Sequence, residues 1–319
     1  MEKLFEKRQL SFVKNLRWSM LLSLVLILPG LAGLVSLAFG AELFNFDVDF
    51  VGGTVIEYSF EQEITESDTD RISEIAAEHF GIAPPAVQRG SEEGFATPTR
   101  ATIRIRAVVT EEQQSAFRDA MRTEFADWGV RDSEDPALNI APEINQVGSS
   151  VGRDLRQAAI MSAVVALLLV LLYITVRFEF KMGLTTIAVM VHDVLAMLSV
   201  YVILQIPVNM TFIAAVLTIL GYTINSNIII FDRVRETRRI EKKSNRAQIV
   251  DKATFETLPR TINTTLTTLL PIVFLIVLGV TSVQNFAIPL FGGILIGAYS
   301  SIFLSGPLWS LFSPKTKKA

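Results

Sequence analysis

The chain alternates between long apolar runs and stretches rich in polar and charged residues. Six apolar runs stand out, at 17–39, 157–176, 182–204, 210–231, 262–281 and 286–311. An α-helix rises about 1.5 Å per residue and the hydrocarbon core of a bilayer is about 30 Å thick, so each run is long enough to cross a membrane. The pattern predicts a polytopic α-helical membrane protein with six transmembrane helices.

Between the first two runs the hydrophobic period changes. Alternating β-branched stretches predict strands there, and two amphipathic stretches predict helices. The predicted order is strand 54–60, helix 67–80, strand 86–91, strand 101–107, helix 110–125 and strand 139–147. This is the split βαβ order, so we expect an α+β ferredoxin-like extracytoplasmic domain. It shows no catalytic constellation, and we expect it to bind rather than to catalyse.

These patterns divide the chain into four parts. The predicted parts are a cytoplasmic N-terminus with transmembrane helix 1 (1–39), the extracytoplasmic domain (40–156), transmembrane helices 2–6 (157–311) and a cytoplasmic C-terminal tail (312–319). The first apolar run exceeds the length usual for a cleaved signal peptide, which favours an uncleaved anchor over cleavage.

Charge distribution sets the expected orientation. Lysine and arginine gather in 1–17, 177–181, 232–260 and 315–318, whereas 41–156 holds 23 acidic against 10 basic residues. Short basic segments stay in the cytoplasm. We therefore expect a multi-pass membrane protein with both termini in the cytoplasm. The basic loop at 232–260 either sets this topology or docks a partner.

Composition excludes several kinds of site. Half of the 319 residues are hydrophobic and 19% are charged, with no cysteine and two histidines, His79 and His192. Disulfides and thiolate metal sites are thus excluded, and little material is left for a zinc site. We expect no metal, no cofactor, no nucleic-acid partner and no enzyme activity.

Polar groups inside apolar runs are candidates for function because they are costly in a membrane. The third run contains His192 and Asp193, which either hold the bundle together by hydrogen bonds or carry a proton or ion. The fourth and fifth runs each carry a polar face, and we expect the two faces to meet: Thr218, Tyr222, Asn225, Ser226 and Asn227, and Arg260, Asn263, Thr264, Thr267 and Thr268. Arg260 either joins this interior or extends to the cytoplasmic interface, as arginines at helix ends commonly do.

The last run shows small residues at intervals of four. They are Gly293, Gly297, Ser301 and Ser305. Such a ladder lets another helix approach closely, and that helix can belong to this chain or to a partner.

Several segments together resemble one family. FDVDFVGGT at 46–54, with Asp49, Phe50, Gly52 and Gly53, is similar to the D-F-x-G-G element of the SecD/SecF membrane proteins. VGSSVG at 147–152, HDVL at 192–195 and RTINTT at 260–265 are similar to further elements of that family. GYTINSNIIIFDRVRE at 221–236, with Gly221, Asp232 and Arg233, resembles the signature of its SecF branch. The SecD branch usually has a much larger outer region.

The resemblance implies partners and a function. It implies pairing with SecD and action with the SecYEG channel, with SecA and YajC as further partners and unfolded preprotein as substrate. It implies use of the ion gradient in protein export across the cytoplasmic membrane. Alternatives are a structural partner of SecD without coupling, and a small-molecule or lipid exporter subunit of the same superfamily.

One position departs from the family pattern. Ser226 stands where the signature has an aspartate, which belongs with the arginine matched by Arg260 to the family's proposed proton path. Serine does not titrate near neutral pH, so coupling needs a carboxylate from the partner or from Asp193. The ion-path candidates are Arg260, Asp193, His192, Asn225 and Ser226. An aspartate introduced at 226 is expected to be tolerated beside Arg260.

Overall fold

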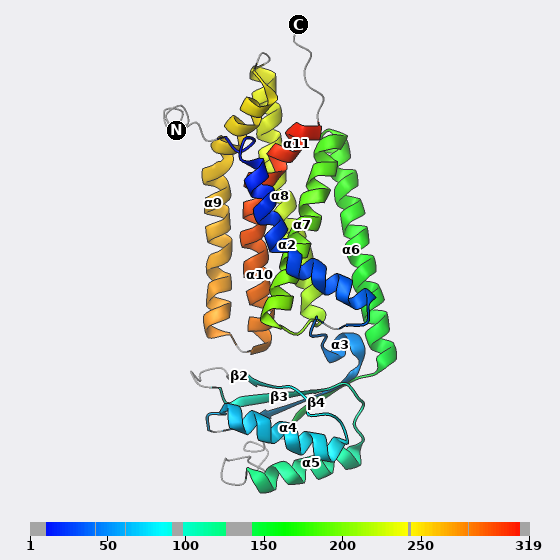
Figure 1. Ribbon diagram of the computed structural model, residues 1–319. Coiled ribbons are helices and arrows are strands. Elements are labelled where there is room, and N and C mark those ends of the chain that lie inside the picture. Colours follow the sequence, from blue (N-terminus) through cyan, green and yellow to red (C-terminus); the bar gives the residue numbers. More distant parts are fainter. Residues whose placement is uncertain are drawn as a thin grey trace.

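The computed structural model describes residues 11–41, 43–60, 62–90, 98–125, 142–241, 244–279 and 281–312. It contains a bundle of long helices and, at one end, a small domain with a four-stranded sheet, which we call the sheet domain (residues 43–148) (Figure 1). The opposite end of the bundle, where α8 ends and α9 begins, is called the basic end.

The six predicted spans are confirmed as helices. They are α2 (Leu16–Ala38), α6 (Ser149–Arg177), α7 (Phe180–Leu204), α8 (Met210–Ile240), α9 (Arg246–Leu278) and a last span made of α10 (Thr281–Ser300), a π-helical turn η2 (Ser301–Ser305) and α11 (Gly306–Phe312). Several of these helices extend beyond the apolar segments that predicted them. The stretch predicted as a basic loop at 232–260 is mostly helix, because α8 continues to Ile240 and Asn245 caps α9 in a reciprocal bond pair with Gln248.

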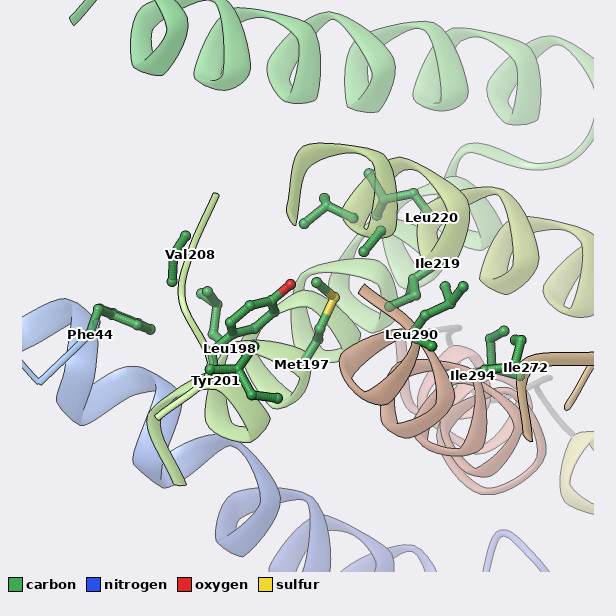
Figure 2. Close-up of a cluster of buried hydrophobic side chains, with 14 of the residues drawn as sticks. Phe44, Met197, Leu198, Tyr201, Val208, Ile219, Leu220, Ile272, Leu290 and Ile294 are labelled. Carbon is green, nitrogen blue, oxygen red and sulfur yellow. The ribbon is translucent and has the colours of Figure 1, made fainter. Parts of the chain in front are cut away.

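The centre of the bundle is formed by α7, α8 and α10. A cluster of buried side chains fills it, including Met197, Tyr201, Ile219 and Leu290, which converge from the three helices in Figure 2. Helix α2 crosses α7 obliquely (Figure 1). Gly30 lies at that crossing, and its N–H donates to Ser199 Oγ at 2.8 Å.

The sheet domain has the predicted ferredoxin-like order. Its elements are α3 (Val48–Val51), β1 (Gly53–Ser59), α4 (Glu66–Phe80), β2 (Val87–Gly90), β3 (Arg100–Ile105), α5 (Glu111–Glu124) and β4 (Glu143–Val147). The strands lie in the order β2-β3-β1-β4, all antiparallel, with Ile56 of β1 opposite both Ile103 and Ile144. Residues 139–141 of the predicted last strand lie outside the described residues. Helix α4 is capped at its N-terminus by Thr65.

The two faces of this sheet differ in character. Ile56, Tyr58 and Ile103 are buried against α4 and α5. The other face is turned toward the bundle (Figure 1) and is polar, with Arg100 Nη1 3.3 Å from Glu57 Oε2 and Arg104 Nε 3.0 Å from Asp47 Oδ1. The strands of the sheet thus carry ion pairs on the face that is turned toward the end of the bundle.

Tyr58 provides a prediction about alkaline pH. Its side chain is 1% exposed, and burial raises the pKa of its phenol from 10.0 to about 12. Because the folded protein holds this proton more tightly than the unfolded chain does, the group contributes to folding stability. This contribution is fully present below pH 10, where the unfolded phenol also stays neutral, and it is lost as pH rises toward 12. In an absorbance titration, the difference between the wild type and Tyr58→Phe should show a phenolate midpoint near 12. A midpoint near 10 would contradict the burial.

Candidate functional site

Asp193 is the centre of a hydrogen-bonded network inside the bundle. Its side chain is 0% exposed, on α7. Oδ2 accepts hydrogen bonds from Thr223 Oγ1 of α8 at 2.7 Å and from Ser300 Oγ of α10 at 2.9 Å. Oδ1 lies 2.9 Å from His192 Nδ1. Three helices therefore meet at one carboxylate, which fits the structural interpretation of Asp193.

The ladder of small residues makes this meeting possible. A side chain at Gly297 would place its Cβ 3.0 Å from Thr223 Oγ1 and 3.6 Å from Asp193 Oδ2, and one at Gly293 would collide with Ile219 of α8. Ser305 Oγ donates to Asn227 Oδ1 of α8 at 2.5 Å, and Ser301 Oγ to Gly297 O at 2.6 Å. The ladder thus packs against α8 of the same chain.

The polar face of α8 divides between two surroundings. Ser226 is 3% exposed and Asn227 0%, whereas Asn225 is exposed. Tyr222 Oη lies 2.5 Å from Thr265 Oγ1 of α9, so α8 and α9 do meet through polar groups. The polar residues of α9 that were named from the sequence have other surroundings. The hydroxyls of Thr264, Thr267 and Thr268 donate to carbonyls of their own helix, and Asn263 is exposed.

Arg260 lies in a different place from Ser226. It is exposed and lines a cleft of 570 Å³ between α6, α8 and α9, together with Asn225 and Asp232. Two ion pairs border the cleft, because Arg233 Nε lies 2.6 Å from Glu256 Oε2 and Arg233 Nη1 lies 2.6 Å from Glu236 Oε2. Ser226 does not line it. Of the two positions considered for Arg260, the structure shows the exposed one, whereas Ser226 is buried inside the bundle.

The segment 46–54 joins the sheet domain to the bundle. Asp49 Oδ2 accepts a hydrogen bond from the N–H of Met210, the first residue of α8, at 2.9 Å. Phe50 is buried in the bundle core. Gly52 and Gly53 have φ of 82° and 145°, and a Cβ at Gly53 would collide with the carbonyl of Ile105.

The other positions shared with the family lie outside the Asp193 network. Gly221 has open space around it, Asp232 and Arg233 belong to the cleft, and Gly152 brings α6 against Phe50, whose carbonyl oxygen would lie 3.1 Å from an added Cβ. Thr223 and Ser300 were missed from the sequence, because neutral hydroxyls in a span usually indicate packing alone. Their spacing relative to residues already named offered a partial indication, because Thr223 lies four residues before Asn227 and Ser300 is next to Ser301 of the ladder.

Gly53→Ala tests the junction. An L-residue at φ 145° is strained, and the Cβ meets backbone, so we expect a loss of about 1–3 kcal/mol of stability. Gly81→Ala is the matched control: it also has positive φ, 64°, but nothing lies within 4 Å of its Cβ. Thermal unfolding in mild detergent should show a clearly larger loss for Gly53→Ala. Equal losses would count against close packing at the junction.

Comparisons with known proteins agree on one family. The family model described as "Protein export membrane protein SecD/SecF, C-terminal" matches residues 133–315. The protein translocase subunit SecF of Rickettsia conorii is 35% identical over 274 residues, which cover 86% of this chain and 83% of the relative. SecF of Helicobacter pylori is 30% identical over 307 residues, covering 96% and 88% of the two chains.

Solved structures agree in fold. The crystal structure of SecDF, a translocon-associated membrane protein from Thermus thermophilus, superimposes with a TM-score of 0.74 at 28% identity over 96% of this chain. A structure of SecDF in a super-membrane-facing form gives a TM-score of 0.63 at 30% identity. This chain spans 40% of the first SecDF chain and 38% of the second. The chain therefore belongs to the SecD/SecF family of protein-export membrane proteins, as a SecF subunit of the protein translocase, an accessory multi-pass membrane protein and not an enzyme.

Proposed function

We propose that this chain pairs with a SecD subunit and uses the ion gradient to help draw preproteins across the cytoplasmic membrane through the SecYEG channel. The observation that carries the pairing is the cleft that holds Arg260. Its charged groups face outward from the bundle, and charged groups in a membrane are placed against protein or water rather than lipid.

The helices that flank the cleft support this pairing. Helix α6 exposes a row of apolar side chains, and α9 exposes another on the other side of the cleft: Ile160, Val164, Leu168 and Leu172, and Leu266, Leu270, Phe274 and Val277. A second six-helix unit laid across α6 and α9 would cover the cleft. The two SecDF chains are more than twice as long as this one, and so have room for such a unit.

The proposed topology follows from charge. The basic end lies in the cytoplasm and the sheet domain outside, where it meets the emerging chain. An elementary charge that crosses 100 mV releases about 2.3 kcal/mol, which suffices to bias a two-state outer domain. SecA and YajC are further proposed partners at the channel.

A scaffold without coupling is the second candidate. It is favoured by Ser226, which leaves the apolar segment of the fourth span, residues 210–231, without a carboxylate. It predicts pairing with SecD but no response to the gradient. The exporter alternative predicts efflux by this chain alone in liposomes.

Cross-linking tests the pairing directly. The chain has no cysteine, so single cysteines can be introduced as unique reactive positions. Leu168→Cys on α6 and Leu270→Cys on α9 should cross-link to co-expressed SecD, whereas the control Leu22→Cys, exposed on α2, should not. Absence of SecD from the cross-linked and copurified products of both flanking positions would overturn the proposal.

A further inference from the structure

The pair Asp193 and His192 has the surroundings of a proton-binding site. An ionised carboxylate at 0% exposure is costly without a cation, and no lysine or arginine in the described chain pairs with Asp193. Hydroxyls of Thr223 and Ser300 stabilise the charged form by donating to Oδ2. The described surroundings therefore supply hydrogen bonds to the carboxyl group but no fixed positive charge.

The groups that face Asp193 from the packed helices are otherwise neutral. Tyr222 of α8 lies against Gly297, but its hydroxyl meets Thr265. Tyr299 of α10 donates to the carbonyl of Ser19 on α2. His192 is thus the titratable neighbour in contact with the carboxylate.

A line of buried polar groups leads from Asp193 toward the basic end. Thr223 is followed one turn later on α8 by Asn227, which accepts from Ser305. The next residue, Gly306, faces Thr254 Oγ1 of α9, at 3.4 Å from an added Cβ. We call these residues, with Trp309, the polar file: Thr223, Asn227, Ser305, Thr254 and Trp309.

The polar file contains buried atoms that lack partners. Asn227 Nδ2, Thr254 Oγ1 and Trp309 Nε1 have no hydrogen-bond partner within the described part of the chain, and the same holds for His192 Nε2 at the other end. Buried polar atoms are normally satisfied, by water where protein does not reach. Several such atoms along one line favour a hydrated path.

The π-helical turn η2 aligns this path. In a regular α-helix, residues five apart point about 140° away from each other. Ser300 and Ser305 nevertheless both face the interior, toward Asp193 and Asn227, because the wide turn between them takes up the difference. Single π-turns inside α-helices occur frequently at functional sites.

We propose that Asp193, with His192, is the proton-binding site of this chain, and that protons pass between it and the basic end along the polar file. The carboxylate takes up one proton to become a carboxylic acid and releases the same proton when the bundle changes state. The site thereby replaces the carboxylate absent at Ser226. Oxygen–oxygen contacts of 2.7 and 2.9 Å leave no gap for a sodium ion between the hydroxyls and Oδ2. Only the effect on export rests on the function proposed above.

Infrared spectroscopy of the purified full chain tests the site without any partner. A pH titration should reveal the carbonyl-stretch band of a protonated carboxylic acid that is lost in Asp193→Asn. The band should persist in Asp154→Asn, a matched control on the exposed surface of α6. Ser300→Ala keeps the carboxyl group but removes one hydrogen-bond donor, so the band should move to higher frequency. This second variant keeps the test decisive if Asp193→Asn does not fold.

The outcomes separate the two proposals. A band that persists in Asp193→Asn, or that stays unmoved in Ser300→Ala, would overturn the proton site. Displacement of the band by sodium at constant pH would also overturn it, in favour of a sodium site. Export assays in inverted vesicles follow: if Asp193 titrates but export ignores the gradient in the wild type, the proposed function fails and the proton site stands.

Discussion

Replacing Gly297 with leucine is expected to prevent most of the protein molecules from folding into a stable bundle. The added side chain starts 3.0 Å from Thr223 Oγ1 and 3.4 Å from the ring of Tyr222, both on α8. Overpacking of a close-packed site typically costs about 1–3 kcal/mol. Here α8 must also move away from α10, so Asp193 loses partners on one side and a buried carboxylate is left poorly satisfied.

The measurement is the yield of monodisperse protein by size-exclusion chromatography in mild detergent, with the melting temperature of what remains. Gly221→Leu is the matched control, because nothing lies within 4 Å of its added Cβ although it lies on the same helix as Thr223. We expect near wild-type behaviour from the control. Similar losses in both variants would show that the ladder is not a tight contact.

Aspartates introduced at positions 225 and 226 are expected to behave in opposite ways. Around a helix, Asn225 lies about 160° from Thr223 and Ser226 only about 60° from it. An aspartate at 226 would be enclosed on the side that holds Asp193, and a second buried charge carries a penalty on the order of several kcal/mol. An aspartate at 225 would enter the cleft that Arg260 lines, where a cation favours the charged carboxylate.

We therefore expect Asn225→Asp to keep the wild-type melting temperature or raise it slightly, and Ser226→Asp to lower it clearly. This reverses the expectation from sequence that an aspartate at 226 is tolerated beside Arg260. Adding Arg260→Gln should remove any gain from Asn225→Asp and leave Ser226→Asp unchanged. A Ser226→Asp variant as stable as the wild type, and destabilised by Arg260→Gln, would show that Arg260 reaches the interior.

Much of the architecture was predictable because the signals were long and repeated. The six spans followed from apolar runs, and the strand order of the sheet domain followed from alternation in stretches such as Ile103 and Ile105. Boundaries were less certain because polar residues continue a helix beyond the membrane. Helix α8 therefore runs on to Ile240, where composition alone suggested a loop.

The site was predictable only in part. Asp193 and His192 were identified because charged groups are rare in apolar runs, yet their partners could not be named. The register of the last span is the reason: an α-helical ladder indicates Ser301, whereas the π-helical turn lets Ser300 and Ser305 make the contacts. The separation of Ser226 from Arg260 likewise depends on how far α8 is rotated relative to α9, which no single-chain pattern reveals.

The arrangement also suggests how the two ends of the chain communicate. Helix α8 begins at the residue that Asp49 caps, carries Thr223 at its middle, and ends beside the cleft. A change in the protonation of Asp193 that shifted α8 would therefore also displace the contact with the sheet domain and the surface proposed to contact SecD.

The most direct test of this account is preprotein translocation into inverted membrane vesicles that contain the chain together with its SecD partner, with and without an uncoupler. Vesicles lacking the chain provide the baseline. The account predicts that the chain stimulates translocation, that the uncoupler removes this stimulation, and that Asp193→Asn shows the uncoupled rate under both conditions. Stimulation of equal size with and without the uncoupler would contradict it and would identify the chain as a scaffold.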